Sequence, residues 1–390
     1  MLNFLRIQNF KAFEDVSLHF KPLTLMAGLN GMGKSSVLQS LLLLRQSYEQ
    51  RLLNQGLALN GNLVKIGSGR DALFEGAASD NISFELGFQS ESIKSLSYIY
   101  RYDRKSDVIE AIDPSSGTKD LEDLPLFSDY FQYLQSERLG PRTVSEMSDY
   151  LVRQHLQIGI SGEYTAHFLA TFGNARIHSI EGHDRDSNRD EIPNASHPQA
   201  KSLSLKDQVE AWMGEISPGT RIKISSNPDI DLMSIQYSFV MGKDVSNPYR
   251  STNVGFGISY TLPIIVAVLA SAPGSLILIE NPEAHLHPRG QSKIGELLAL
   301  VASYGIQIII ETHSDHVLNG IRVAVHGGKI KPDDVQLHYF QRAADREGAS
   351  TEVISPKIDR NGRIDRWPDG FFDEWERNLD ILLEPARNED

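Results

Sequence analysis

The chain has 390 residues and a formal net charge of −13, with 38 basic against 51 acidic side chains. This acidic balance argues against a protein whose whole surface coats nucleic acid, although it is compatible with a local basic patch. Hydrophobic residues make up 40% of the chain and cysteine is absent, so a large core is possible, whereas disulfides and a cysteine nucleophile are excluded. With no signal-peptide pattern at the N-terminus, we expect a cytoplasmic protein.

Two segments at the start of the chain, 4–10 and 16–27, have the composition of β-strands. A glycine-rich loop follows at 28–33, and apolar residues at helical spacing then predict a helix over 35–50. In the order strand, glycine loop and helix, backbone N–H groups at the helix N-terminus can bind phosphate.

The loop Gly28–Ser35 matches the pattern G-x-x-x-x-G-K-[ST]. Its glycines let successive amides face a phosphate, Lys34 is placed to reach the β and γ phosphates, and the Ser35 hydroxyl is placed for Mg²⁺. The predicted nucleotide-binding residues of this loop are Asn30, Gly31, Met32, Gly33, Lys34, Ser35 and Ser36.

Between about residues 81 and 245 the pattern changes to short alternating segments, which predict an antiparallel, half-exposed sheet. These segments are 82–86, 97–102, 221–225 and 234–240. We also expect a turn at 113–117, a polar surface loop over 181–201 and a short helix over 205–216.

An uncharged segment of 22 residues, 258–279, is long enough to suggest a membrane span. However, Pro263 and Pro273-Gly274 interrupt it, which favours a helix of about 15 residues and a short buried strand. We therefore predict no membrane span.

Strands and helices then alternate, which indicates a parallel sheet. The expected elements are strand 276–279, helix 291–303, strand 307–310, helix 315–325, strands 335–340 and 351–354, and a terminal helix from Phe371.

Polar residues follow two of these apolar strands. Glu280 ends the first strand, and Glu311-Thr312-His313-Ser314 follows the second. An open α/β sheet places its ligand-binding residues at such strand ends, and a carboxylate there can hold Mg²⁺ or orient a water molecule. We predict that Ser35 and Glu280 hold the metal ion.

At this point the sequence resembles the ABC-type P-loop ATPase heads of the RecF, SMC and OLD-like group. Four segments carry the resemblance: Asn9–Lys11 with the phosphate loop, 251–259 as a degenerate signature motif, 276–288 as the Walker B strand and D-loop, and 311–314 as the switch-histidine strand. The resemblance adds Lys11 to the nucleotide-binding residues. The terminal RWPDGFFDEW suggests a bacterial subgroup of such AAA-type ATPases with an uncharacterised C-terminal extension.

The resemblance implies an α/β fold, a P-loop NTPase head of the ABC type with an inserted, strand-rich α+β region. It divides the chain into an N-terminal lobe (1–80), an inserted subdomain (81–245), a C-terminal lobe (246–345) and an extension (346–390). It also implies ATP and Mg²⁺ as cofactors and a homodimer that sandwiches ATP between two heads. The signature residues Asn253, Gly255 and Gly257 would then reach the partner's ATP.

The sequence departs from the family pattern after the Walker B strand. Many ABC heads have a second acid there, but this chain has Asn281, which cannot accept a proton from water. Either Glu283 supplies the catalytic carboxylate, which we favour, or hydrolysis is slow and ATP binding is the signal. His313 would sense the γ-phosphate, so the predicted catalytic residues are Glu280, Glu283 and His313.

The predicted function is that of a slow ATPase that controls a separate protein effector, in phage defence or DNA maintenance. Two alternatives stay open: a RecF-like repair ATPase that binds DNA through a local patch, and a non-catalytic, ATP-gated scaffold. We expect no OLD-type nuclease domain, because only 77 residues follow His313. A metal cluster at Glu283, His285 and His287 is disfavoured, and Arg138 is equally compatible with a phosphate contact and a structural turn.

Overall fold

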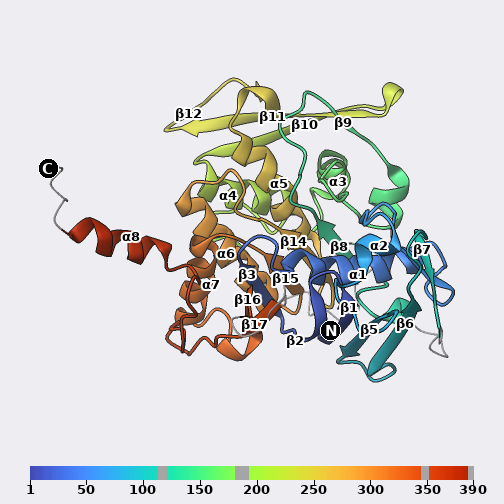
Figure 1. The fold of residues 1–390 in the computed structure, drawn as a ribbon. Helices are drawn as coiled ribbons and strands as arrows, with labels where there is room; N and C mark the ends of the chain where they lie inside the picture. The colour runs from blue at the N-terminus through green and yellow to red at the C-terminus, as the bar shows by residue number, and fades with distance from the viewer. Residues whose placement is uncertain (113–120, 181–192, 344–350, 385–390) are drawn as a thin grey trace, which may run out of the picture.

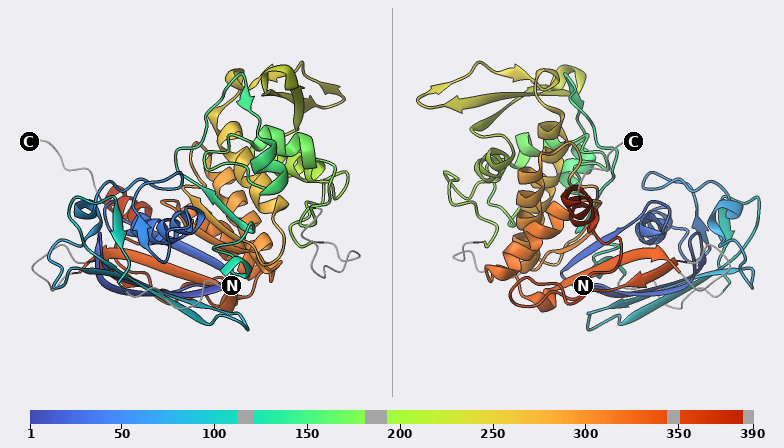
Figure 2. Two further views of the ribbon diagram at one scale, coloured as in Figure 1. Left: turned by 90° about the vertical axis from the view of Figure 1, so that its right-hand side faces the viewer. Right: turned by 60° about the vertical axis from the view of Figure 1, so that its left-hand side comes forward.

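The computed structural model describes residues 1–112, 121–180, 193–343 and 351–384. The turn predicted at 113–117 and most of the loop predicted over 181–201 lie outside the described residues. Figure 2 shows two lobes, a lower one built on β-sheets and an upper one of helices that carries a small sheet at its far end. The long helices of the upper lobe stand on the sheets of the lower one (Figure 1).

The central sheet has six strands in the order β17-β16-β3-β15-β14-β8, and all neighbours are parallel except β16 and β17. Its strands are β3 (Leu23–Gly28), β8 (Phe131–Leu134), β14 (Leu276–Glu280), β15 (Gln307–Glu311), β16 (Val335–Arg342) and β17 (Thr351–Ile354). The phosphate-loop strand β3 is therefore flanked by β15 and β16, and β14 lies one strand further away.

Both faces of this sheet are buried, because alternate residues of each strand point to opposite sides. Ile277 and Ile279 belong to the core formed with α4 (Leu205–Ile216), α5 (Phe256–Ala270), α6 (Pro288–Ser303) and α7 (Asp315–His326). Leu276 and Leu278 belong to the core formed with α1 (Lys34–Glu49) and the N-terminal strands. Continuous apolar strands such as Leu276–Ile279 are the pattern expected for a parallel sheet covered on both sides.

A second, antiparallel sheet has the order β2-β1-β5-β6. It contains β1 (Leu2–Phe10), β2 (Phe13–His19), β5 (Asn81–Phe88) and β6 (Ser95–Arg101). The boundary predicted between residues 80 and 81 separates strands that pair here, because β1 and β5 are hydrogen-bonded neighbours. The small strands β4 (Gly56–Ala58) and β7 (Val108–Glu110) pair beside this sheet.

The described residues form eight α-helices, most of which cover the central sheet or connect its strands. They are α1 (Lys34–Glu49), α2 (Gly69–Ala72), α3 (Thr165–Phe172), α4 (Leu205–Ile216), α5 (Phe256–Ala270), α6 (Pro288–Ser303), α7 (Asp315–His326) and α8 (Glu374–Leu383). Short helical turns occur at Leu121–Asp123, Tyr150–Gln154, Pro228–Ile230, Ser251–Asn253 and Pro332–Asp334. Within the residues that the structure describes, no helix combines the length and apolar character that a bilayer crossing requires.

The upper lobe ends in a small antiparallel sheet built on β11. Its strands are β9 (Ser145–Glu146), β10 (Thr220–Asn227), β11 (Leu232–Met241), β12 (Asp244–Val245) and β13 (Tyr249–Arg250). The last of them leads directly into the segment before α5, which carries the predicted signature residues.

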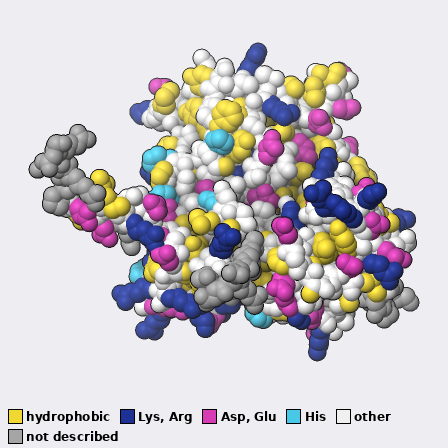
Figure 3. All heavy atoms as spheres, viewed as in Figure 1, with side chains coloured by type: hydrophobic (Ala, Val, Ile, Leu, Met, Phe, Trp, Pro, Cys, Tyr) yellow, Lys and Arg dark blue, Asp and Glu magenta, His cyan; other side chains and the backbone are white. Residues whose placement is uncertain are grey.

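Two predicted elements are wrong in their bounds. The strand expected over 16–27 is two strands, β2 and β3, in different sheets, because the chain turns at Lys21-Pro22. The terminal helix begins at Glu374 rather than Phe371, since Phe372 takes a positive φ of 56° that ends regular structure there. Phe371 is fully buried against Tyr339, while Trp375 lies exposed on α8, which projects from the body (Figures 1 and 3).

Candidate functional site

The phosphate loop connects the end of β3 to the first residue of α1. Gly28 has φ 143°, and a Cβ there would lie 2.2 Å from the carbonyl oxygen of Phe340 on β16. Gly33 has φ 87°, and a Cβ there would lie within 3 Å of Phe13 and Ala12. These two positions therefore require glycine for both conformation and space. No side chain caps α1, whose first N–H groups face the loop.

Lys34 lies under this loop and is only 3% exposed. Its Nζ donates hydrogen bonds to the carbonyl oxygens of Gly28 and Leu29, at 2.9 Å each. Burial lowers the pKa of Lys34, while the nearby carboxylate of Glu311 opposes that shift. An ammonium group has three donors, so Lys34 can hold the loop and still donate one hydrogen bond to a phosphate.

A pocket with a volume of about 830 Å³ opens beside the loop. Its volume lies in the range of sites that hold nucleotide-sized ligands. Of the predicted nucleotide-binding residues, all but Met32 line this pocket: Lys11, Asn30, Gly31, Gly33, Lys34, Ser35 and Ser36. The pocket is also lined by Glu311 and by residues that the sequence did not single out, among them Gln39, Arg70, Asp71, Phe74 and Tyr102.

Lys11 reaches this pocket from the end of β1 with a positive φ of 49°. Its backbone N–H donates to Ala72 in α2, and its Nζ donates to the side chain of Gln39 at 2.8 Å. Burial lowers the pKa of Lys11, and Asp71 partly offsets that shift. Lys11 thus joins the antiparallel sheet to the wall of the pocket.

Glu280, at the end of β14, is held from the side of β8. The Tyr133 hydroxyl donates to one carboxylate oxygen at 2.8 Å, and the Ser136 N–H donates to the other at 3.0 Å. Burial is the main cause that raises the pKa of Tyr133, and Glu280 adds to it. Tyr133 is therefore a neutral donor, and both oxygens of Glu280 are engaged on the side away from β3.

Arg138 supports the same strand end from behind and is only 2% exposed. Its guanidinium donates to four backbone carbonyls, those of Gln135, Tyr260, Glu280 and Asn281, at 2.7 to 3.1 Å. The guanidinium carbon also lies over the Tyr260 ring, 5.5 Å from the ring centre. The structure thus favours the structural turn over the phosphate contact for Arg138.

The tip of β15 faces the phosphate loop. Glu311 pairs in register with Glu280 on one side and with Met26 of β3 on the other. Its Oε1 accepts a hydrogen bond from the Ser35 hydroxyl at 3.0 Å, while Oε2 is buried and has no hydrogen-bond partner among the described residues. Burial raises the pKa of Glu311 to about 7, and the neighbouring charge of Glu280 adds to this shift.

Glu283 and His313 meet just beyond these strand ends. Glu283 accepts hydrogen bonds from the Thr312 hydroxyl at 2.7 Å and from the His313 backbone N–H at 2.8 Å. Burial and the charge of Lys34 lower the pKa of His313, and Glu283 acts in the opposite direction. The His313 side chain is therefore neutral at pH 7 and is exposed next to the phosphate loop's lysine.

Asn281 has an unusual backbone between these groups, with φ 44°. Its N–H donates to the carbonyl oxygen of Glu311, and its side-chain oxygen is buried without a hydrogen-bond partner in the part of the chain that the structure describes. It thus ties the two strand ends together through the backbone. Glu280, Glu283, Glu311 and His313 consequently gather at one edge of the central sheet.

The predicted signature residues lie elsewhere. Asn253, Gly255 and Gly257 line a separate hollow of about 460 Å³, together with His285 and His287, and share no lining residue with the phosphate-loop pocket. A Cβ at Gly255 would meet nothing within 4 Å, whereas one at Gly257 would lie 2.6 Å from the carbonyl oxygen of His285. Within one chain, the structure therefore does not bring the signature to the loop.

The side chains at the phosphate loop suit Mg²⁺, which prefers oxygen ligands and usually takes one or two carboxylates along with nucleotide phosphates. The Ser35 hydroxyl and the carboxylates of Glu280 and Glu311 offer such oxygens, and the unpartnered Oε2 of Glu311 needs a partner. In the described part of the chain, no group of three or more His, Asp or Glu residues is arranged as an all-protein metal site. Among the residues covered by this statement are Glu283, His285 and His287, where the sequence disfavours a metal ion.

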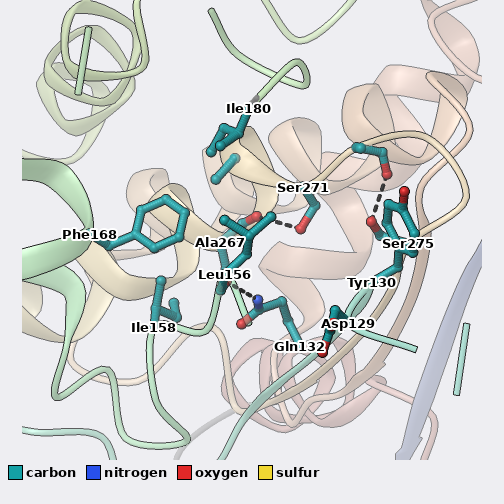
Figure 4. Close-up of a pocket in the computed structure, with 12 residues that line it drawn as sticks. Asp129, Tyr130, Gln132, Leu156, Ile158, Phe168, Ile180, Ala267, Ser271 and Ser275 are labelled. Carbon is teal, nitrogen blue, oxygen red and sulfur yellow. Dashed lines mark hydrogen bonds between the residues drawn. The ribbon is translucent and has the colours of Figure 1, made fainter. Parts of the chain in front are cut away.

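Another cavity lies behind β8, between α3 and α5 (Figure 4). It is bounded by apolar side chains such as Phe168 and Ile158, and Gln132 on its floor donates to the carbonyl of Leu156 at 2.6 Å. Its volume of about 30 Å³ suits a water molecule or two rather than a nucleotide.

Comparisons with known proteins agree with this architecture. The family model described as "AAA domain, putative AbiEii toxin, Type IV TA system" matches residues 23–319. A second family, "Protein of unknown function (DUF3696)", matches residues 330–382. No curated protein sequence matches the chain.

Two solved structures of SMC heads cover nearly the whole chain. An SMC head bound to the C-terminal winged-helix domain of ScpA is 14% identical, with a TM-score of 0.51, over 92% of this chain and 98% of that one. An SMC head with an extended coiled coil, bound to the C-terminal domain of ScpA from Pyrococcus furiosus, is 12% identical, with a TM-score of 0.51, over 98% and 99%. At these identities the likeness shows the fold, and it confirms the predicted ABC-type P-loop head.

Proposed function

The chain belongs to the AAA-domain family whose model covers residues 23–319, and we propose that it binds ATP with Mg²⁺, dimerises on the nucleotide and hydrolyses it slowly. The observation that carries this proposal is the pocket around the phosphate loop, where Lys34, Ser35 and the N-terminus of α1 meet one opening. Backbone amides at a helix N-terminus, together with a lysine, form an anion site that suits a polyphosphate.

Within this pocket, we assign the triphosphate to the loop and α1, and the nucleoside to the wall that contains Arg70, Asp71 and Tyr102. An aromatic ring and an arginine can pack against a base, and a carboxylate can accept hydrogen bonds from ribose hydroxyls. Lys11 lies between these two parts and would contact the phosphates from the side of β1.

The signature hollow supports a dimer. Asn253, Gly255 and Gly257 lie at the N-terminal end of α5, and Gly255 leaves open space around its Cα. Because this surface and the phosphate-loop pocket share no residue in one chain, two copies related by a two-fold axis would each complete the other's site. ATP bound between them would hold the pair together.

For hydrolysis, Glu283 supplies the carboxylate base that Asn281 cannot provide. Both of its oxygens accept hydrogen bonds, from Thr312 and from the His313 N–H, so only one lone pair of each oxygen remains to orient water. This engagement supports slow turnover, and it favours the ATP-gated scaffold as the second candidate function. His313, neutral and exposed beside Lys34, would contact the γ-phosphate.

A protein effector is the expected partner. The two similar SMC heads were solved with domains of ScpA bound to them, and an ATP-dependent dimer gives such a partner two states to distinguish. On the face drawn in Figure 3, acidic and basic side chains are interspersed, with one group of Lys and Arg side chains on the side where Figure 1 labels α2. That group is where a local nucleic-acid contact would be tested.

The nucleotide proposal is tested by titrating a fluorescent ATP analogue into the wild type and Lys34→Ala in the presence of Mg²⁺. We expect about 10- to 100-fold weaker binding for the variant, the range of one or two lost charge-assisted hydrogen bonds. Lys329→Ala, at an exposed position three residues beyond the end of α7, is the matched control and should bind as the wild type does. Equal affinity in all three proteins would sink the proposal.

The dimer is tested by sedimentation of Glu283→Gln with and without ATP. We expect dimers only with ATP, and monomers under both conditions when Gly255→Glu is added, because a side chain at this position fits the monomer but blocks the partner's nucleotide. ATP-independent association, or dimers that tolerate Gly255→Glu, would contradict the sandwich arrangement.

A further inference from the structure

The strand order places Glu311 closer to the phosphate loop than Glu280. Glu311 is paired with Met26 on β3, the strand that leads into the loop. Glu280 is paired with Glu311 and lies one strand further away. Since neighbouring strands are about 4.8 Å apart, the end of β14 is roughly 10 Å from the end of β3 across the sheet, and the end of β15 is half that.

Glu311 also contacts the loop's hydroxyl directly. The Ser35 hydroxyl donates to Oε1 of Glu311 at 3.0 Å. Adjacent oxygen ligands of an octahedral Mg²⁺ are about 3 Å apart, given metal–oxygen distances near 2.1 Å. The Ser35 and Glu311 oxygens therefore already have the spacing that two neighbouring ligands of one cation require.

The second oxygen of Glu311 is a buried polar atom of the described residues that lacks a hydrogen-bond donor. Glu311 is 6% exposed, and none of the residues in the described ranges donates a hydrogen bond to its Oε2. A buried carboxylate oxygen without a donor is costly, and a cation is the partner that offsets this cost most directly. By contrast, each oxygen of Glu280 already accepts a hydrogen bond, one from the Tyr133 hydroxyl and the other from the Ser136 N–H.

We propose that Glu311, together with Ser35, holds the divalent cation of the bound ATP–Mg²⁺ complex, in the part that the sequence pattern assigned to Glu280. The inference rests on the proposed ATP binding and deepens it. Glu280 then lies one strand further from the phosphate loop, where Tyr133 and Ser136 hold it beside the metal-binding carboxylate of Glu311. One carboxylate and one hydroxyl suffice from the protein, because the phosphates and water supply the other ligands.

The test measures how strongly Mg²⁺ tightens binding of a fluorescent ATP analogue, by titrations in saturating Mg²⁺ and in EDTA. The wild type should bind about tenfold or more tightly with Mg²⁺, the scale on which single groups around a metal matter. Glu311→Gln should lose most of this difference and bind in EDTA at least as well as the wild type, since a negative charge beside the phosphates is gone. Glu280→Gln should keep the difference.

Two further variants make the outcome independent of folding defects. Glu311→Asp keeps the charge but shortens the side chain, so it should also lose the Mg²⁺ dependence while its thermal unfolding stays close to that of the wild type. Ser35→Ala combined with Glu311→Gln should lose no more than either change alone, because both groups hold one ion.

The inference is overturned if Glu311→Gln keeps the wild-type Mg²⁺ dependence, if Glu280→Gln loses it instead, or if the Ser35 and Glu311 effects add. A wild type that binds no nucleotide, with or without Mg²⁺, would overturn the proposed function itself and this inference with it. A wild type that binds equally in Mg²⁺ and EDTA would overturn the inference and leave ATP binding standing.

Discussion

The ends of β14 and β15 lie side by side, and each carries a glutamate after an apolar strand, yet their surroundings differ. Glu280 is turned toward β8, where Tyr133 binds it, and Arg138 holds the backbone behind it. Glu311 is turned toward the phosphate loop, where it binds Ser35. The difference shows that the position of a strand in the sheet, rather than the similarity of two motifs, decides which carboxylate meets the nucleotide.

The largest expected effect comes from removing the side chain that supports the end of β14. Arg138→Ala should lower the free energy of unfolding by about 3 kcal/mol or more, because four backbone carbonyls lose a buried, charged donor. Chemical denaturation would measure it. Arg138→Lys should recover only part of the loss, since an ammonium group cannot reproduce the forked geometry.

The matched control for this change is Arg142→Ala, four residues along the same segment and exposed. It should alter the free energy of unfolding by no more than about 0.5 kcal/mol. An Arg138→Ala protein as stable as Arg142→Ala would show that the β14 end does not depend on Arg138.

A second test compares the two glutamates without nucleotide. Burial and Glu280 raise the pKa of Glu311 to about 7 from an ordinary value of 4.5, so the folded protein binds more protons than the unfolded chain between these pH values. The stability from this group is fully present below pH 4.5 and is lost as the pH rises through 7. Glu311→Gln should therefore be more stable than the wild type at pH 8, by roughly 1 to 3 kcal/mol.

Glu280→Gln should behave in the opposite way. An amide in place of Glu280 would turn a donor toward Tyr133 or the Ser136 N–H, which should cost about 1 kcal/mol. Thermal unfolding of both variants at pH 5 and pH 8 would show the contrast. If both glutamines shift stability in the same direction at pH 8, the two strand ends do not differ in the way described.

The smallest expected effect is that of Tyr133→Phe. Loss of one buried hydroxyl that donates to Glu280 should reduce the free energy of unfolding by about 1 kcal/mol. It should leave the Mg²⁺ dependence of nucleotide binding unchanged, because Glu280 is not the carboxylate next to Ser35. A loss of Mg²⁺ dependence in Tyr133→Phe would indicate that Glu280, at the end of β14, holds the metal ion.

Much of the site's local structure could be predicted from the sequence. The glycine loop, α1, and the succession of α5, β14, α6, β15 and α7 follow from the spacing of apolar residues, and each is present with bounds within a few residues. Strand β8 was missed, because its four residues Phe131–Leu134 are too few to show a period. The split of 16–27 was missed as well, since its apolar residues continue across Lys21-Pro22.

Glu311 shows why the rest of the site could not be predicted. The sequence did show that Glu311 ends an apolar strand, just as Glu280 does. It did not show which of the two strands, β14 or β15, lies next to β3 in the sheet. Arg138 posed a similar problem: its residue type suggested a phosphate contact as readily as a turn, and only the four carbonyls around it decide for the turn.

The sequence by itself determined that this protein has a phosphate loop between a buried strand and a helix, followed by two parallel strands that end in acids. Local spacing and the conformational needs of glycine suffice for that. Only the tertiary structure decided which acid lies beside Ser35, and that the signature glycines form a separate surface. Those relations depend on the order of strands in the sheet and on contacts between residues far apart in the chain, which local patterns do not encode.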